Sequence, residues 1–256
     1  MPPTAAQGRA ANVLRVSNRN QPEAEKQMPW YIEIPVVIAL TLAFIFIIQT
    51  FIGRMYVIPS ASMEPTLHGF NGTGDRVAVE KVSYYFRDPA PGDVVVFEGT
   101  DAWNSSYVST RSDNPLVAGL QTVGSWVGLV PPDENNLVKR IIAEGGQTVS
   151  CQAGDPAVMV DGAPIDQSYI LQPPENPINP ATGSRECGGD YFGPVTVPEG
   201  HYFMMGDNRT NSLDSRAHMV DELQGTIPRE NLRGKVAAVV FPLNRFGGVA
   251  SPDIQG

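Results

Sequence analysis

The feature that most constrains the fold is an uncharged apolar run near the start of the chain, from Ile34 to Ile52. Nineteen residues at 1.5 Å each form a helix of roughly 28 Å, about the thickness of the hydrocarbon core of a bilayer. Trp30, Tyr31 and Tyr56 flank the run, as aromatic residues do at membrane interfaces. The pattern therefore predicts a transmembrane helix over residues 30–53.

A cleaved signal sequence is the alternative reading of this run. Its apolar part would be shorter and closer to the start, and an Ala-x-Ala cleavage site would follow it. The nearest stretch of small residues, Ser60-Ala61-Ser62, matches such a site poorly. We therefore interpret the run as an uncleaved anchor.

The flanking charge predicts the orientation of the anchor. Residues 1–29 are polar, without apolar periodicity, and indicate a disordered tail. Residues 1–33 contain four basic groups against three acidic ones. Because basic flanks favour the cytoplasmic side, we expect a single-pass protein of the cell membrane, with a cytoplasmic N-terminus and residues 54–256 outside.

Amino-acid composition and net charge indicate the structural class of the rest of the chain and exclude some kinds of partner. The 25 glycines and 23 prolines suit turn-rich β structure better than a helix bundle. The net charge of −9 argues against a nucleic-acid partner, because such proteins carry a basic surface. His, Cys, Asp and Glu do not cluster at ligand spacings and no glycine-rich phosphate loop is present, so we expect neither a metal nor a cofactor.

Beyond the anchor the pattern is that of β-strands. Alternation over Arg76–Glu80 and apolar runs elsewhere predict strands at 76–80, 93–97, 137–143, 201–205 and 235–241. Asp161-Gly162 predicts the type I′ turn of a hairpin between 158–160 and 163–165. Residues 99–136 and the proline-rich residues 172–190 indicate loop insertions. The fold class expected for 54–256 is mainly β, a coiled antiparallel sheet or barrel-like domain with long loops.

Two cysteines leave one question open. Cys151 and Cys187 lack the spacing of a zinc or redox site. Outside the cytoplasm a disulfide between them is expected, whereas two unpaired thiols are the alternative.

Ser62 lies ten residues after Ile52 and is a candidate nucleophile that needs a base. No histidine (His68, His201 or His218) stands in a triad motif. Lys139 shares a strand face with Leu137 and Ile141, which is an apolar setting. A lysine whose stem lies on apolar surface is the plain interpretation. The chemical interpretation is that burial lowers its pKa, so that the neutral amine takes the proton of Ser62.

Four blocks carry a resemblance to a known family. They are 58–67, with Ser60-Ala61-Ser62-Met63-Glu64-Pro65-Thr66; 74–81; 139–147, beginning Lys139-Arg140; and 206–216, with Gly206-Asp207-Asn208-Arg209 and Asn211-Ser212-Leu213-Asp214-Ser215-Arg216. Together and in this order, the chain resembles type I signal peptidase (leader peptidase) of bacteria. The resemblance covers neither residues 1–29 nor the long loops.

The resemblance implies a membrane-bound serine endopeptidase of β-rich fold that removes signal peptides from exported pre-proteins, cutting after small residues of the Ala-x-Ala type. It implies that Ser62 is the nucleophile and that Lys139 is the general base and then the acid. Ser60 and the Ser62 N–H would form the oxyanion hole. Ser212 would orient Lys139, Asp214 and Arg216 would pair, and the loop would be braced by Asp207, Asn208 and Arg209. Composition alone favours a solvated turn for 206–216.

The neighbours of the dyad are either substrate-pocket walls or plain core: Ile58, Pro59, Met63, Leu67 and Val138. Aromatic residues at 84–86, Trp103 or Trp126 are candidates to enter lipid. The expected partners are secretory pre-proteins and the bilayer, with the protein-export translocon nearby.

Two other functions remain open from the sequence. One is a related Ser–Lys protease that cuts itself or one dedicated partner. The other is a tethered β domain that binds secreted proteins without catalysis, with Ser62 as a loop residue. Cleavage of an Ala-x-Ala peptide, and its loss in Ser62→Ala or Lys139→Ala, separates these readings.

Overall fold

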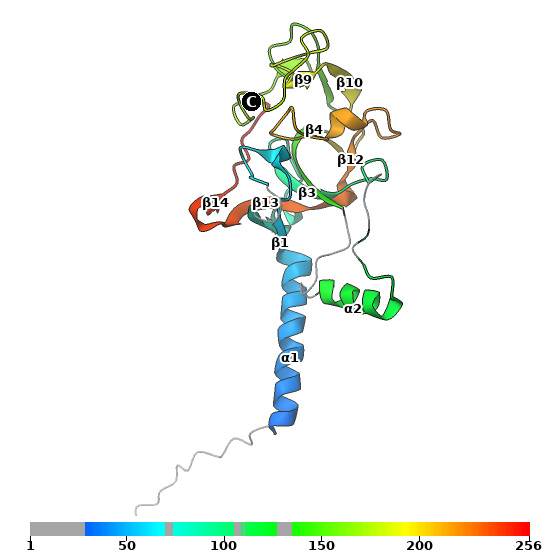
Figure 1. Cartoon of the computed structure of the whole chain (residues 1–256), viewed down its shortest axis with the longest axis vertical. Coiled ribbons are helices and arrows are strands. Elements are labelled where there is room, and N and C mark those ends of the chain that lie inside the picture. Colours follow the sequence, from blue (N-terminus) through cyan, green and yellow to red (C-terminus); the bar gives the residue numbers. More distant parts are fainter. Residues whose placement is uncertain (1–28, 70–73, 105–108, 110, 127–134) are drawn as a thin grey trace, which may run out of the picture. The chain divides into compact units, whose positions relative to one another are not determined.

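The structure is a computed structural model that describes residues 29–69, 74–104, 109, 111–126 and 135–256 (Figure 1). The predicted disordered tail lies almost wholly outside the described residues. The chain divides into two compact units, 1–40 and 41–256. The second unit contains every strand and every candidate catalytic residue.

The apolar run forms one continuous helical segment. Helix α1 spans Trp30–Ile47, and a π-helical turn continues it over Ile48–Ile52. These 23 residues are long and apolar enough to cross a membrane, by length and composition. Strand β1 (Gly53–Val57) follows at once, so the helix ends one residue before the predicted boundary.

An antiparallel sheet of eight strands forms the centre of the second unit (Figure 1). Its order is β1, β2, β13, β3, β4, β11, β12, and β14 pairs with β13. The bounds are Arg76–Glu80 for β2, Leu232–Phe241 for β13, Val94–Glu98 for β3, Asn136–Glu144 for β4, His201–Met205 for β11, Ile227–Pro228 for β12 and Gly247–Gly248 for β14. The mainly β, antiparallel prediction is confirmed. Within the described residues β1 and β12 are the two edge strands and do not pair with each other, so the sheet does not close into a barrel.

A smaller sheet carries the predicted hairpin. It joins β10 (Phe192–Thr196), β5 (Thr148–Cys151), β6 (Met159–Val160) and β7 (Ala163–Pro164). Asp161 and Gly162 have φ angles of 51° and 80°, which are the positive values that a type I′ turn requires.

The two predicted insertions differ in content. Residues 172–190 hold only the two-residue strands β8 (Gly183–Ser184) and β9 (Gly189–Asp190), in keeping with their prolines. The segment 99–136 contains helix α2 (Pro115–Trp126), which the polar composition of that segment did not predict.

Trp103 is buried rather than available to lipid. It packs edge-on against Phe97 and stacks on His218 at 4.4 Å between ring centres. This corrects the expectation of lipid contact for Trp103. Tyr85 and Phe86, by contrast, are exposed, and the side chain of Trp126 is outside the described residues.

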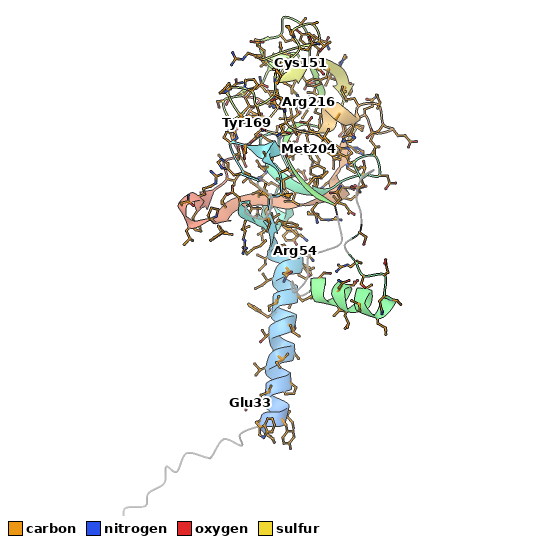
Figure 2. All side chains as sticks on the ribbon, in the orientation of Figure 1. Glu33, Arg54, Cys151, Tyr169, Met204 and Arg216 are labelled. Carbon is orange, nitrogen blue, oxygen red and sulfur yellow. A yellow bond between two sulfur atoms is a disulfide. The ribbon has the colours of Figure 1, made fainter. Side chains whose placement is uncertain are left out.

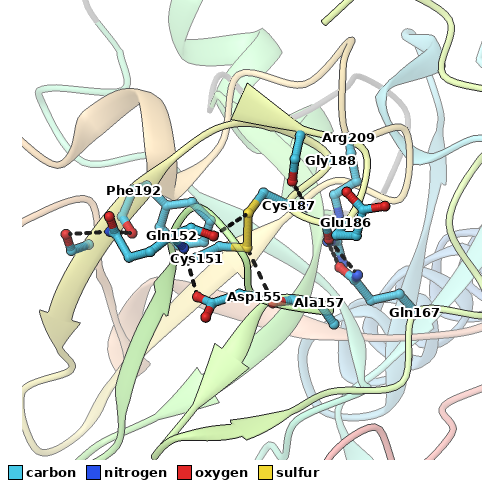
Figure 3. The surroundings of a disulfide bond; sticks show 12 residues. Cys151, Gln152, Asp155, Ala157, Gln167, Glu186, Cys187, Gly188, Phe192 and Arg209 are labelled. Atoms are coloured by element: carbon cyan, nitrogen blue, oxygen red, sulfur yellow. Dashed lines mark hydrogen bonds between the residues drawn. A yellow bond between two sulfur atoms is a disulfide. The ribbon is translucent and has the colours of Figure 1, made fainter. Parts of the chain in front are cut away.

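The cysteines are joined. Cys151 in β5 and Cys187 in the 172–190 segment form a buried disulfide (Figure 3). The alternative of two unpaired thiols is therefore wrong. The bond ties the proline-rich segment to the smaller sheet.

Candidate active site

Ser62 sits in a single 3-10 turn, Ala61–Met63, directly after the extended residue Ser60. Packing anchors the turn, because Met63 and Leu67 are buried in the hydrophobic core. The Ser62 carbonyl accepts a hydrogen bond from the backbone N–H of Asn208 at 3.1 Å. The backbone of the candidate nucleophile is therefore fixed on two sides.

Lys139 lies in the middle of β4, opposite Val95 of β3. Its strand neighbours Leu137 and Ile141 belong to one apolar cluster, as the period of two predicts. The side chain is 4% exposed, and its Nζ lies 2.7 Å from Ser62 Oγ. The buried lysine is thus directed at the candidate nucleophile and does not reach solvent.

Burial lowers the pKa of Lys139 to about 8, because the charged amine loses its hydration. Arg216 acts in the same direction, whereas Asp214 and, to a smaller degree, Asp207 oppose the shift. A substantial fraction of the amine is therefore neutral in mildly alkaline solution. This is the protonation state that a general base requires.

Ser60 lies on the same side of the turn as Ser62. Its hydroxyl donates to Ser62 Oγ at 3.2 Å. The predicted partner of the oxyanion hole is therefore within reach of the atom that would attack. Ser60 is also exposed, so a substrate can approach it.

Asp214 and Arg216 form the predicted ion pair. Arg216 donates from Nε and Nη2 to the two carboxylate oxygens, each at 2.9 Å. Burial disfavours the ionised carboxylate, but the Arg216 guanidinium and the N–H of Gly206 outweigh it and lower the pKa of Asp214. The pair stays charged beside Lys139.

The residues 207–209 fix the loop to the nucleophile turn. Asn208 Nδ2 donates to the Ala61 carbonyl at 3.2 Å. Asp207 is paired with Arg140, and Arg209 donates from Nε to the Gly206 carbonyl at 3.2 Å. Residues 206–209, 214 and 215 are buried and bonded, which contradicts a fully solvated turn, whereas Asn211 and Leu213 are exposed.

Ser212 packs into the site. Its Oγ is buried and has no hydrogen-bond partner among the described residues. A Cβ placed at Gly206 would lie 2.3 Å from this oxygen and 2.5 Å from the Ser62 carbonyl. The predicted hydrogen bond from Ser212 to Lys139 is not formed, although the residue borders the nucleophile.

Sequence reasoning missed several supporting residues. Arg140 forms a bidentate pair with Asp207 at 2.7 and 2.9 Å, both side chains being 1% exposed. Tyr169 lies under this guanidinium at 4.3 Å from ring centre to Cζ. A buried ion pair between positions 67 residues apart leaves no local signal in the sequence.

The proline-rich segment also reaches the site. Leu171 N–H donates to the Asp207 carbonyl at 3.0 Å, and Asn208 and Asn211 both donate to the carboxylate of Glu175. Nothing in the composition of 172–190 predicted this role.

Most of the predicted pocket residues lie in the core. Ile58, Met63 and Leu67 are buried members of one cluster, and Val138 packs against it. Pro59 is exposed and lines a cavity of about 940 Å³, formed by the end of the helical segment with β1 and β2. The lining of that cavity includes neither Ser62 nor Lys139.

The arrangement suits acyl transfer by a serine. The candidate nucleophile, Ser62 Oγ, has two groups within 3.2 Å. They are the buried amine of Lys139, whose pKa is lowered, and the hydroxyl of Ser60, which is a donor. Among the described residues no group of three His, Cys, Asp or Glu side chains could hold a metal ion.

Comparisons with known proteins show the family to which the chain is similar. The model of the family described as "Signal peptidase, peptidase S26" matches residues 31–241. A "Probable signal peptidase I" of Mycobacterium leprae is 46% identical over 88% of this chain and 81% of its own length. A "Signal peptidase I" of Mycobacterium tuberculosis is 47% identical over 87% of this chain and 76% of its own length. A solved signal peptidase I from Enterococcus faecalis aligns over 59% of this chain and 98% of its own, with 21% identity and a TM-score of 0.36.

Proposed function

Since this chain belongs to the signal peptidase family, peptidase S26, and is thus a serine endopeptidase that removes signal peptides, we propose that it works through a dyad of Ser62 and Lys139. The observation that carries the proposal is the 2.7 Å contact between the Lys139 amine and the Ser62 hydroxyl. Lys139 is buried and its amine is directed at the serine.

In the proposed first step, neutral Lys139 takes the proton of Ser62 as Oγ attacks the carbonyl carbon of the scissile bond. The oxyanion accepts hydrogen bonds from the Ser62 N–H and the Ser60 hydroxyl. Protonated Lys139 then gives its proton to the leaving amine, and the peptide bond breaks. The mature protein leaves, and the signal peptide stays esterified to Ser62.

In the second step the same amine acts on water. Lys139 takes a proton from the water that attacks the ester carbonyl, and the proton returns to Ser62 Oγ as the ester breaks. The signal peptide leaves as a carboxylic acid, and the dyad is restored. The charged pair of Asp214 and Arg216 lies beside the lysine and acts on it electrostatically, and Asp207, Asn208 and Arg209 hold the 206–216 loop on the nucleophile turn.

We propose residues 30–53 as a transmembrane anchor, with the preceding tail in the cytoplasm and residues 54–256 outside. Ser62 lies ten residues after Ile52, so the nucleophile lies at most about 35 Å from the end of the anchor even if the chain were extended. A signal peptide in the same bilayer presents its cleavage site at the same surface, close to the translocon that delivers it. Tethering raises the effective concentration of the substrate.

Cleavage after small residues, of the Ala-x-Ala type, is part of the proposal. The support lies in the packing around the dyad. Apolar residues surround the nucleophile turn, with Met63 and Leu67 in the core and Pro59 exposed, which suits contact with small apolar side chains. Tyr85 and Phe86 are the exposed aromatic residues that we assign to lipid contact.

The test uses detergent-solubilised full-length protein and a pre-protein with one Ala-x-Ala site. Ser62→Ala should abolish the cut. Lys139→Arg should also abolish it, because arginine keeps the charge but stays protonated. Ser168→Ala removes an exposed hydroxyl elsewhere and should cut at the parental rate. Parental activity in either dyad variant would overturn the mechanism.

A further inference from the structure

The end of the helical segment is bonded to one short stretch of the catalytic unit. The last carbonyls of a helix have no partner within it. Here Thr50 O accepts from Lys81 Nζ at 3.2 Å, Phe51 O accepts from the Tyr85 hydroxyl at 3.0 Å, and Ile52 O accepts from the Lys81 N–H at 2.9 Å. We call Lys81 and Tyr85 the junction clasp.

No flexible linker separates this clasp from the sheet. Gly53 pairs with Glu80, and five consecutive pairs run from there to Val57 with Arg76. A Cβ at Gly53 would lie 2.2 Å from the Val79 carbonyl, so the two strands approach closely where the helix ends. Arg54, labelled in Figure 2, donates back to the Gln49 carbonyl at 3.3 Å.

The hydrogen bonding continues towards the nucleophile. Ile58 is buried and its N–H donates to the Asp75 carbonyl at 2.9 Å. Four residues later the chain reaches Ser62. From Gly53 to Val57 the path is a paired strand and not a loose tether, so the clasp, where the helical segment meets this strand, is the place at which slack can arise.

We propose that Lys81 and Tyr85 determine which peptide bond of a membrane-bound substrate is cut, by holding Ser62 at a fixed distance from the end of the anchor. The inference rests on the proposed function. A substrate whose apolar segment lies in the bilayer presents each successive bond about 3.3 Å further from the surface, if extended. Slack of a few ångströms at the clasp is then enough to bring a neighbouring bond to Ser62.

A structural role alone would make a different prediction. If the clasp only satisfied the helix end, its loss would lower stability or reduce all activity together. Selection of the bond predicts a change in the product ratio of a membrane-bound substrate, with no change for a short peptide in solution. The two readings are separated by comparing these substrates.

The experiment uses full-length protein in vesicles of phosphatidylethanolamine and phosphatidylglycerol. The substrate is a pre-protein with two Ala-x-Ala sites three residues apart, and mass spectrometry gives the ratio of products. Lys81→Met with Tyr85→Phe should raise the share of the second product several-fold. The kcat/KM for an Ala-x-Ala peptide in detergent should stay within twofold of the parent. Tyr85→Phe alone removes one exposed hydroxyl, and should shift the ratio in the same direction.

Tyr84→Phe is the matched control. Its hydroxyl donates to Asp93 and not to the helix end, so the product ratio should stay parental. An unchanged ratio in both clasp variants would overturn the inference, as would an equal fall in the cutting of peptide and pre-protein. A parent that cuts neither substrate would instead overturn the proposed function.

Discussion

The amine of Lys139 lies 2.7 Å from the hydroxyl of Ser62, although the two residues are 77 positions apart. One comes from the middle of a central strand and the other from a turn just beyond the helical segment. The loop 206–209 holds that turn through the Ser62 and Ala61 carbonyls. The dyad therefore depends on three separate parts of the chain, and each can be perturbed alone.

Replacing Lys139 should reveal the stability cost of a buried amine. Below pH 8 the amine is charged in the folded and the unfolded chain, and the folded protein bears the full cost of burial. The cost falls as the pH rises from about 8 to the unfolded value of 10.5. At about 1.4 kcal/mol per pKa unit, Lys139→Met should be more stable than the parent at pH 6.5 by up to about 3 kcal/mol.

Thermal unfolding of both proteins at pH 6.5 and pH 10 measures this difference. We expect the inactive variant to have the higher Tm at pH 6.5, and the gap to shrink at pH 10. If the parent has the higher Tm at pH 6.5, burial of the charged Lys139 amine does not destabilise the folded protein.

Ser60→Ala should reduce kcat and leave KM nearly unchanged. Its hydroxyl is 3.2 Å from Ser62 Oγ, and a donor that acts only on the oxyanion contributes in the transition state alone. Loss of one such donor costs about 10²–10³ in kcat. Steady-state kinetics on an Ala-x-Ala peptide tests this. A variant that raises KM at unchanged kcat would assign Ser60 to substrate binding.

Gly206→Ala should impair catalysis by a steric clash that displaces the nucleophile turn, although no catalytic group is changed. The new methyl group would lie 2.5 Å from the Ser62 carbonyl and 2.3 Å from Ser212 Oγ, so the nucleophile turn must shift. A displacement of about 1 Å can cost about 10²-fold in rate. Gly247→Ala is the control, since no atom lies within 4 Å of a Cβ at that position. Equal activity of the two variants in a peptide assay would contradict the packing seen at Gly206.

The Cys151–Cys187 disulfide should contribute strongly to stability. It closes a loop with a sequence separation of 36, for which loop entropy gives about 3–4 kcal/mol. For a domain of this size, the double variant Cys151→Ser, Cys187→Ser should unfold roughly 10 °C lower. Gly188, next to Cys187, also accepts from Arg216 at 3.2 Å, so the bond supports the ion pair beside Lys139. A Tm equal to that of the oxidised parent would show that the loop is held by other contacts.

Local patterns predicted the strands and the hairpin well. Arg76–Glu80 alternates and forms β2 with those bounds, and Asp161-Gly162 forms its turn. Strand β1 was missed because it directly follows the apolar helical segment, and Gly53 alone at the boundary predicts the end of a helix but not the start of a strand. Strand β5 alternates but is only four residues long, and Gly193-Pro194 interrupts the alternation of β10, so neither was predicted.

The sequence likewise predicted some residues of the candidate site and not others. Ser62 and Lys139 were identified by a motif and by an apolar strand face, and the structure brings them together. The partners of Arg140 and Asn208 come from distant segments, as does the Gly188 carbonyl that accepts from Arg216, and pairing at that range depends on the tertiary fold. Motif and periodicity carry no information on such pairs.

The central claim is that neutral Lys139 is the base for Ser62. It is tested most directly by the pH dependence of kcat/KM for an Ala-x-Ala peptide between pH 5 and pH 10, with folding checked at each pH. Because burial lowers the pKa of Lys139 to about 8, activity should fall about tenfold per pH unit below that value. Lys139→Arg should be inactive throughout the range. A parental profile that stays flat from pH 8 down to pH 5 would contradict the lysine base.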